Sequence, residues 1–271
     1  MYPSQSQLQT NLSSELIDSH CHLDLEPLHS DLCNVLENAR QAGLTSFVVP
    51  GVHPGGWDKI AALARKENSI LPAFGIHPLH AGLVDDTTLN QLEKLAGRAC
   101  AIGEIGLDPF CRVPLEVQEV AFKKQLRLAV SVGLPVLIHC RRLFQKTLQL
   151  LKEEQVGRVG GIMHSFSGSV EMAHEFIRLG FFISISGTVT WQGAVRPVKL
   201  ARELPLESLV LETDAPDLSP QIYRGQPNQP AFLLEVLQTV AAIRGIGQEE
   251  LARQTSLNLL KLLKNRLQFD I

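Results

Sequence analysis

The feature that most constrains the fold is a recurrence of short apolar runs, rich in β-branched residues, which alternate with longer segments of helical periodicity. The runs read LIDSH, TSFVVP, ILPAFG, CAIGEIG, PVLIH, GGIMH, FFISIS and LVLETD. Among the longer segments, residues 31–43, 116–133 and 170–180 each carry an apolar stripe and end on a glycine, as amphipathic helices do. A strand followed by a helix, again and again, indicates parallel strands joined by crossover helices.

Eight such units predict an α/β fold, a single (β/α)8 barrel of the TIM type. The length of 271 residues suits this barrel, which typically runs to about 250 residues as one domain. An open doubly wound sheet is the alternative, but no G-x-G-x-x-G follows the first run. We expect residues 1–14 to form a flexible polar tail and residues 15–271 to form the barrel.

Side chains of the kind that bind metals gather at the ends of five of these runs. They are His20 and His22 at the first, Glu104 at the fourth, His139 at the fifth, His164 at the sixth and Asp214 at the eighth. In a parallel barrel the carboxyl ends of the strands form one rim, which carries the chemistry of such enzymes. Any one of these residues alone is compatible with an ordinary loop. Burying all six together requires a compensating cation, so the pattern predicts a metal site.

The number of these residues favours two ions over one. Four histidines and two carboxylates exceed the roughly three protein ligands of a catalytic zinc, and they suit two cations about 3.5–4 Å apart. A carboxylate can bridge two ions whereas a neutral imidazole cannot, so Glu104 is the expected bridge. We expect His20, His22 and Asp214 around one ion and the remaining histidines around the other. Mixed nitrogen and oxygen donors accept zinc, manganese or magnesium.

These motifs, in their order along the chain, resemble those of the TatD family of metal-dependent deoxyribonucleases, within the amidohydrolase-like barrels. The resemblance rests on DSHCHLD, GIHP, GEIGLD, HCR, HSFSG and ETDAP. It implies a TIM-type barrel, two divalent metals and hydrolysis of phosphodiester bonds in DNA. It also implies the ligand set named above, namely His20, His22, Glu104, His139, His164 and Asp214.

Two catalytic roles are expected at this site, those of Glu104 and Asp214. A carboxylate beside an activated water can accept its proton, so Asp214 is either a ligand alone or also the general base. Glu212 precedes it by two residues and is placed to orient a ligand histidine.

Four further residues are candidates for substrate contact: His77, Arg112, Arg141 and Asn228. His77 is either a phosphate or leaving-group contact or a structural histidine before Pro78. Arg141 either holds phosphate or pairs with a rim carboxylate, and Asn228 is placed to shape the loop over the mouth.

Composition limits the partners of the chain. The formal net charge of -3 provides no general basic field for gripping duplex nucleic acid, so we expect trimming of DNA ends or single strands. The five cysteines form no CxxC pair, which favours a reducing cytoplasm without disulfides. The polar start does not read as a signal peptide, no apolar run is long enough for a membrane span, and we expect a monomer.

Two alternatives stay open at this point. The first is a metallohydrolase of another ester or amide on the same barrel, including an ester linked to tRNA. The second is a barrel without metals that serves as a binding scaffold, and an intact ligand set argues against it.

Overall fold

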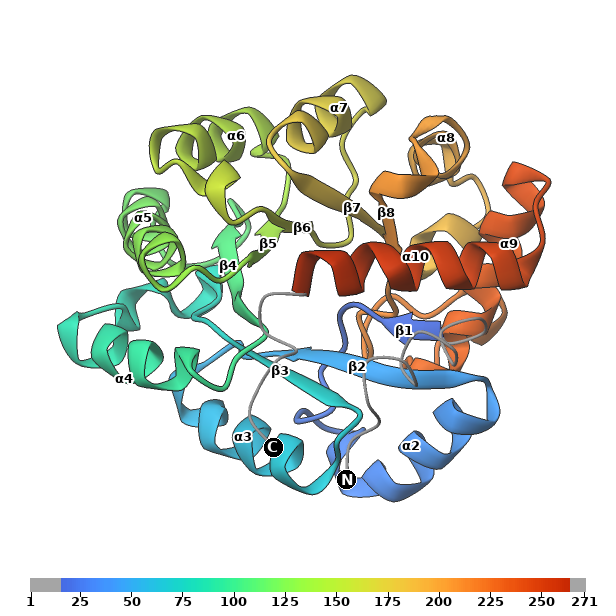
Figure 1. The fold of residues 1–271 in the computed structure, drawn as a ribbon, viewed down its shortest axis with the longest axis horizontal. Helices are drawn as coiled ribbons and strands as arrows, with labels where there is room; N and C mark the ends of the chain where they lie inside the picture. The colour runs from blue at the N-terminus through green and yellow to red at the C-terminus, as the bar shows by residue number, and fades with distance from the viewer. Residues whose placement is uncertain (1–15, 264–271) are drawn as a thin grey trace.

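A computed structural model describes residues 16–263, in which eight strands form one ring of helix-covered sheet (Figure 1). The strands are β1 Leu16–Asp18, β2 Leu44–Pro50, β3 Ile70–Phe74, β4 Ala101–Leu107, β5 Val136–Cys140, β6 Gly161–Met163, β7 Phe181–Ile185 and β8 Leu209–Leu211. The helices between and after them are α2 Leu32–Gln41, α3 Trp57–Lys66, α4 Asp86–Ala96, α5 Leu115–Val132, α6 Phe144–Glu153, α7 Val170–Arg178, α8 Val195–Glu203, α9 Leu233–Arg244 and α10 Gln248–Leu263.

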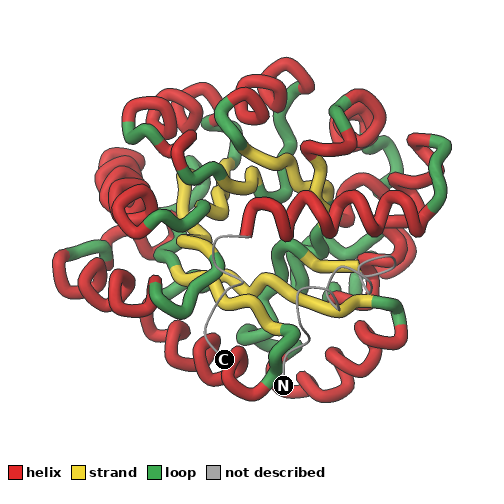
Figure 2. The backbone as a smooth tube through the Cα atoms, viewed as in Figure 1, coloured by secondary structure: helices red, strands yellow, loops and turns green. Residues whose placement is uncertain are grey.

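The strands follow one another in chain order and all neighbouring pairs from β1 to β8 are parallel. Figure 2 shows the strands inside and the helices outside, as crossover connections require. Where β8 returns to β1, Ser19 N–H donates to Leu211 O at 3.0 Å, which joins the first and last strands. The predicted single TIM-type barrel is therefore confirmed.

Alternation along the strands separates two apolar layers. In β2, Val48 faces the inside of the ring, whereas Phe47 and Val49 face the surrounding helices. This two-residue period is what a pleated strand imposes. The inner layer contains one or two buried residues from each of seven strands, counting Cys100 directly before β4. Leu259 and Leu263 of α10 complete this layer.

Helix α10 closes the amino-terminal end of the barrel. It lies across the ring in Figure 1 and contacts β1 and β8. The side-chain amide of Asn258 donates to the carbonyl oxygens of Leu206 and Leu209, at 2.8 and 2.7 Å, just before and at the start of β8. The opposite, carboxyl-terminal end is therefore the open one.

The helix ends follow the local chemistry of the chain. Helices α5 and α9 both stop at a glycine in the left-handed conformation, Gly133 at φ 68° and Gly245 at φ 66°, which glycine adopts without a steric penalty. Helix α4 begins with a capping box between Asp85 and Thr88, which satisfies free amide groups of its first turn.

One expectation about β4 was wrong. Glu104 does not end the strand, because β4 continues to Leu107 and pairs with β5 on both sides of it. Between Ile102 and Ile105 the strand advances by three residues while β5 advances by two, which is a β-bulge that turns side chains away from the regular alternation. A Cβ on Gly103 would meet Leu137 Cβ at 2.5 Å, so this bulge depends on glycine.

Some expectations fall outside the described residues, namely the tail 1–14 and the two ends of the predicted domain 15–271. Within residues 16–263, no helix taken singly has the length and apolarity to cross a membrane; one pair bent by 108°, Pro230–Arg244 with Gln248–Leu263, meets those criteria only when joined.

Candidate metal centre

Three of the predicted ligands are positioned by the seam between β1 and β8. Asp214 N–H donates to His20 O at 2.9 Å, and His22 N–H donates to Ala215 O at 2.8 Å. Asp214 adopts a left-handed conformation with φ 59°, which Asp tolerates better than most residues. Consequently the loops after the first and last strands bring their ligand side chains to one point at the open end.

Asp18, the last residue of β1, stabilises this seam by binding the chain that follows β8. Its carboxylate is fully buried and accepts hydrogen bonds from Thr213 N–H at 3.0 Å and from the Thr213 hydroxyl. Asp18 is therefore not directed at the ligand atoms of His20 and His22, although it precedes them by two and four residues at the end of β1. Instead it anchors the residue that precedes Asp214.

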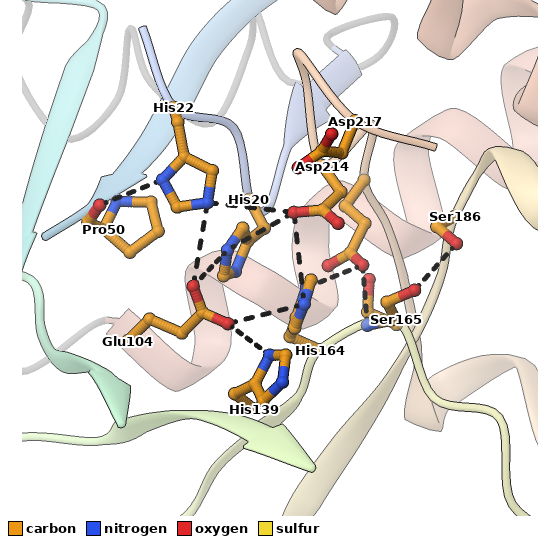
Figure 3. Close-up of polar contacts among 12 residues, drawn as sticks. His20, His22, Pro50, Glu104, His139, His164, Ser165, Ser186, Asp214 and Asp217 are labelled. Atoms are coloured by element: carbon orange, nitrogen blue, oxygen red, sulfur yellow. Dashed lines mark hydrogen bonds and ion pairs between the residues drawn. The ribbon is translucent and has the colours of Figure 1, made fainter. Parts of the chain in front are cut away.

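Glu104 lies at the middle of the ligand set, as Figure 3 shows. Its Oε2 lies 3.4 Å from His20 Nε2 and 3.7 Å from His22 Nε2. Its Oε1 lies 2.8 Å from His139 Nδ1 and 3.5 Å from His164 Nε2. The two oxygens of one buried carboxylate thus face two separate pairs of histidines.

Asp214 completes the first of these groups. The ligand atoms of His20, His22 and Asp214 lie within 4.8 Å of one another, and so do those of His77, Glu104 and His139. All six predicted ligands therefore converge at one end of the barrel.

Outer contacts fix which ring nitrogen of each histidine is free. His22 Nδ1–H donates to the carbonyl oxygen of Pro50 at 3.3 Å, because a carbonyl can only accept. His164 Nδ1 lies 3.0 Å from Glu212 Oε1, which also accepts from Ser165 N–H at 2.6 Å. Both histidines therefore direct Nε2 at the centre, and Glu212 occupies the orienting position that the sequence predicted.

His139 is held differently, between two carboxylates. Its Nδ1 faces Glu104, and its Nε2 lies 3.3 Å from Asp108 Oδ2. Asp108 had no role in the sequence interpretation, although it ends the GEIGLD motif directly after β4. The rule that selected the other residues, a carboxylate at the end of a strand, was sufficient to find it.

His20 carries the clearest sign that a ligand belongs here. Its side chain is 1% exposed, and neither ring nitrogen has a hydrogen-bond partner among the residues described. A buried polar atom without a partner costs free energy, and a metal ion satisfies a histidine nitrogen directly. The donor set of imidazoles and carboxylates therefore fits divalent cations such as zinc, manganese or magnesium.

Two histidines of the centre have raised pKa values. Although burial opposes it, the charge of Glu212 and other carboxylates raises the pKa of His164 to about 10. Burial also opposes the shift at His139, but hydrogen bonds to Asp108 and Glu104 raise its pKa to about 9. In turn, the surrounding histidines overcome burial and hold the pKa of Glu104 well below its usual range.

Other groups are shifted toward their neutral forms. Burial, with the charge of His164, lowers the pKa of His20 to about 4. Burial also lowers the pKa of His77 to about 3. At Asp214, burial raises the pKa to about 7 against the pull of His164. The centre therefore combines neutral imidazoles at His20 and His77 with protonated ones at His139 and His164, which must lose their protons before they can bind a metal.

The four candidates for substrate contact are placed at different depths. His77 is buried beside Glu104, with Nε2 at 3.7 Å from Oε1. Asn228 is also buried, and its amide donates to Thr213 O at 2.8 Å and Asp217 O at 2.7 Å. These bonds favour the interpretation of Asn228 as the residue that shapes the loop after β8.

Both arginines are exposed in the loops after β4 and β5. Arg112 follows β4, and Arg141 follows β5 with its guanidinium carbon 4.5 Å from the centroid of the Phe110 ring. Within residues 16–263, Arg141 forms no ion pair with Glu104 or Glu212. The alternative interpretation, in which Arg141 pairs with a rim carboxylate, is therefore not supported for Glu104 or Glu212.

Residues next to the ligands serve packing and backbone geometry. Cys21 and Cys140 are buried and contribute to packing. Gly106 pairs with His139 inside the sheet. A Cβ there would lie 1.8 Å from His139 O, so close contact between strands explains the glycine.

Comparison with known proteins agrees with this geometry. The family model described as TatD related DNase matches residues 17–264. The uncharacterized metal-dependent hydrolase YabD of Bacillus subtilis is 34% identical over 252 residues, which cover 92% of this chain and 99% of YabD. Human deoxyribonuclease TATDN3 is 34% identical over 263 residues, which cover 91% of this chain and 94% of TATDN3.

A solved structure extends the likeness to three dimensions. The crystal structure of YjjV, a TatD homologue from Escherichia coli K12, matches with a TM-score of 0.86 and 35% identity, over 91% of this chain and 97% of YjjV. Similarity in sequence and in fold covers the whole barrel together with its metal centre. This chain belongs to the TatD family.

Proposed function

We propose that the protein is a metal-dependent hydrolase that holds two divalent cations and cleaves phosphodiester bonds in DNA, trimming ends or single strands. The observation that carries this proposal is the Glu104 carboxylate. One oxygen faces His20 and His22, and the other faces His139 and His164. A carboxylate placed in this way suits a bridge between two ions.

The remaining ligands divide accordingly. His20, His22 and Asp214 would hold one ion, and His139 and His164 the other. When bound, two cations would supply a bound water of lowered pKa and positive charge that offsets the charge on the phosphate during in-line attack. Glu212 and Asp108 keep the rings of the second group in the orientation that points one nitrogen inward.

Asp214 is the proposed general base as well as a ligand. Its side chain is 14% exposed, whereas that of Glu104 is 4% exposed, so water reaches Asp214 more readily. Its Oδ1 lies 3.8 Å from both His20 Nε2 and His22 Nε2. A carboxylate at this place can accept a proton from an attacking water.

His77 is the proposed hydrogen-bond donor to the phosphate or the leaving group. Its Nδ1 accepts a hydrogen bond from Leu79 N–H at 3.1 Å. Because its low pKa keeps the ring neutral, the proton resides on Nε2, which faces Glu104. A nitrogen that carries this proton cannot bind a metal, but it can donate to an oxygen that gains charge.

The choice of DNA rests on family and relatives. The matching family model is described as TatD related DNase, and the human relative is named a deoxyribonuclease. All proposed ligands come from one chain, which supports an active monomer, and five unpaired cysteines support a reducing compartment such as the cytoplasm.

The deciding experiment incubates the protein with labelled single-stranded and double-stranded oligonucleotides, with added metal and with EDTA. We expect shortened products that disappear in EDTA and in Glu104→Gln. The control Glu203→Gln changes an exposed carboxylate of α8 and retains activity. Equal product in EDTA would refute metal dependence. A metal-loaded protein that leaves every oligonucleotide intact would redirect the search to a small ester or amide.

A further inference from the structure

Two groups of arginine and aromatic side chains flank the metal centre, and neither is used by the proposed chemistry. The first, which we call the Phe110 group, consists of Phe110, Arg141 and Arg142. The Phe110 side chain is 54% exposed. The guanidinium carbons of Arg141 and Arg142 lie 4.5 and 5.0 Å from the centroid of its ring.

The Phe110 group is linked directly to the centre. Phe110 N–H donates to Asp108 Oδ1 at 2.8 Å, and the other oxygen of Asp108 lies 3.3 Å from His139 Nε2. Arg142 adopts a left-handed conformation, with φ 63°, which is uncommon outside glycine. Strained backbone of this kind is most frequent at binding sites.

The second group, which we call the Trp191 group, consists of Trp191 and Arg224 in the loops after β7 and β8. The guanidinium carbon of Arg224 lies 4.3 Å from the centroid of the Trp191 ring. The indole N–H donates to Ser219 O at 2.8 Å, which ties the two loops together. Arg224 is exposed and Trp191 is partly exposed.

These groups lie on separate sides of the open end. The strands follow one another in order around a ring of eight, so β4 and β8 are four positions apart, and β5 and β7 are two positions apart. The Phe110 group follows β4 and β5, and the Trp191 group follows β7 and β8. The metal centre, with ligands from β1, β4, β5, β6 and β8, lies between them.

Charge explains why a polyanion needs such groups. The net charge of the chain is -3, and the middle of the open end carries Glu104, Asp108 and Asp214. A phosphate backbone is repelled by these carboxylates unless cations offset them. The arginines on both sides provide local positive charge where the chain as a whole has none.

We propose that a single strand of nucleic acid lies across the open end, with one base stacked on Phe110 and another nucleotide held by the Trp191 group. Aromatic rings with neighbouring arginines bind unpaired bases and the adjacent phosphates. Bases within a duplex are already stacked and offer no free face. This inference rests on the proposed function and adds the strand type and its path.

The test measures binding of fluorescent oligo-dT in EDTA, so that no cleavage occurs, together with KM in the metal-loaded protein. We expect Phe110→Ala to weaken binding about 5- to 100-fold, the range for loss of one stacked base. Arg142→Gln and Arg224→Gln should each lower the slope of log K against log salt by about 0.7. The controls Arg158→Gln before β6 and Lys261→Gln on α10 are exposed and lie away from the open end. They should bind as wild type.

The outcomes separate this inference from the proposed function. If the wild type cleaves but Phe110→Ala and Arg224→Gln keep wild-type affinity and KM, the path is wrong and the function stands. If only one of the two variants is affected, the strand does not cross the open end, which also overturns the inference. If the wild type binds oligo-dT through both groups without cleaving it, the path is supported and the hydrolytic function fails. If it neither binds nor cleaves any oligonucleotide, both fail.

Discussion

Replacement of Glu212 tests whether a buried carboxylate beside the proposed ligand His164 controls the metal affinity of the centre. Glu212 Oε1 lies 3.0 Å from His164 Nδ1 and accepts from Ser165 N–H at 2.6 Å, and the residue is 0% exposed. In Glu212→Gln the amide oxygen keeps both contacts, but the negative charge is lost. His164 then becomes a weaker ligand. We expect a 10- to 100-fold loss of metal affinity, or about 1.4–2.7 kcal/mol.

Glu212→Ala has a different consequence, because it removes the acceptor itself. The partly buried N–H of Ser165 then loses its acceptor, and the ring nitrogen of His164 loses its charged neighbour, at about 1–3 kcal/mol each. We therefore expect the free energy of unfolding to fall by about 2–6 kcal/mol, before any contribution from the cavity that the shorter side chain leaves.

Two measurements on the same samples distinguish these effects. Competition with a chelating dye gives metal affinity, and urea unfolding of the EDTA-treated protein gives stability. Glu203→Gln, exposed on α8, is the control and should change stability by less than about 0.5 kcal/mol. Wild-type metal affinity in Glu212→Gln would refute the orienting role. Equal stability of the Gln and Ala variants would refute the argument from unsatisfied hydrogen bonds.

Three further predictions concern the number of bound ions, the protons released when metal binds, and the close contact between β4 and β5 at Gly106. Glu104→Gln replaces two charged oxygens with one neutral oxygen, so metal content measured by mass spectrometry should fall from two ions per chain to about one or fewer; retention of both ions contradicts the bridge. Raised pKa values of about 9 and 10 keep His139 and His164 protonated at pH 7, so metal binding should release about two protons and tighten as pH rises toward those values. Calorimetry in buffers of different ionisation enthalpy measures this release, and heats that do not depend on buffer contradict it. Gly106→Ala places a Cβ 1.8 Å from a backbone oxygen and should destabilise by more than about 4 kcal/mol, whereas Gly97→Ala, with nothing within 4 Å, should be neutral or stabilising in the same urea titration.

The repeated pattern of strands and helices was sufficient to predict the barrel, since each strand had its own apolar run and three of the segments between the runs carried a clear helical stripe. The ligands were predictable for the same reason. Parallel strands place their carboxyl ends together, so a histidine at the end of β5 and another after β6 must meet. No side-chain coordinates were needed for that inference.

Features that depend on packing between distant segments were not predictable. The bulge at Glu104 arises where Gly103 lies against Leu137 of the neighbouring strand, a contact that local sequence does not reveal. The position of Asp108 at the end of a strand was visible in the sequence, but its contact with His139 Nε2 depends on the ring orientation of that histidine. The role of Asn228 was also hidden in the sequence. Its side chain bonds to Thr213 and Asp217, which come close only because the loop after β8 folds back on itself.

The seam between β1 and β8 bears on how the protein is made. His20 and His22 leave the ribosome early, whereas Asp214 follows nearly two hundred residues later. A nascent chain that lacks the last strand has no means of completing the proposed group of His20, His22 and Asp214, so we expect full metal loading only after synthesis and ring closure have finished. Metal supply would then act at the final step of maturation, and translation products that end before Asp214 would be left without that ion and open to proteolysis.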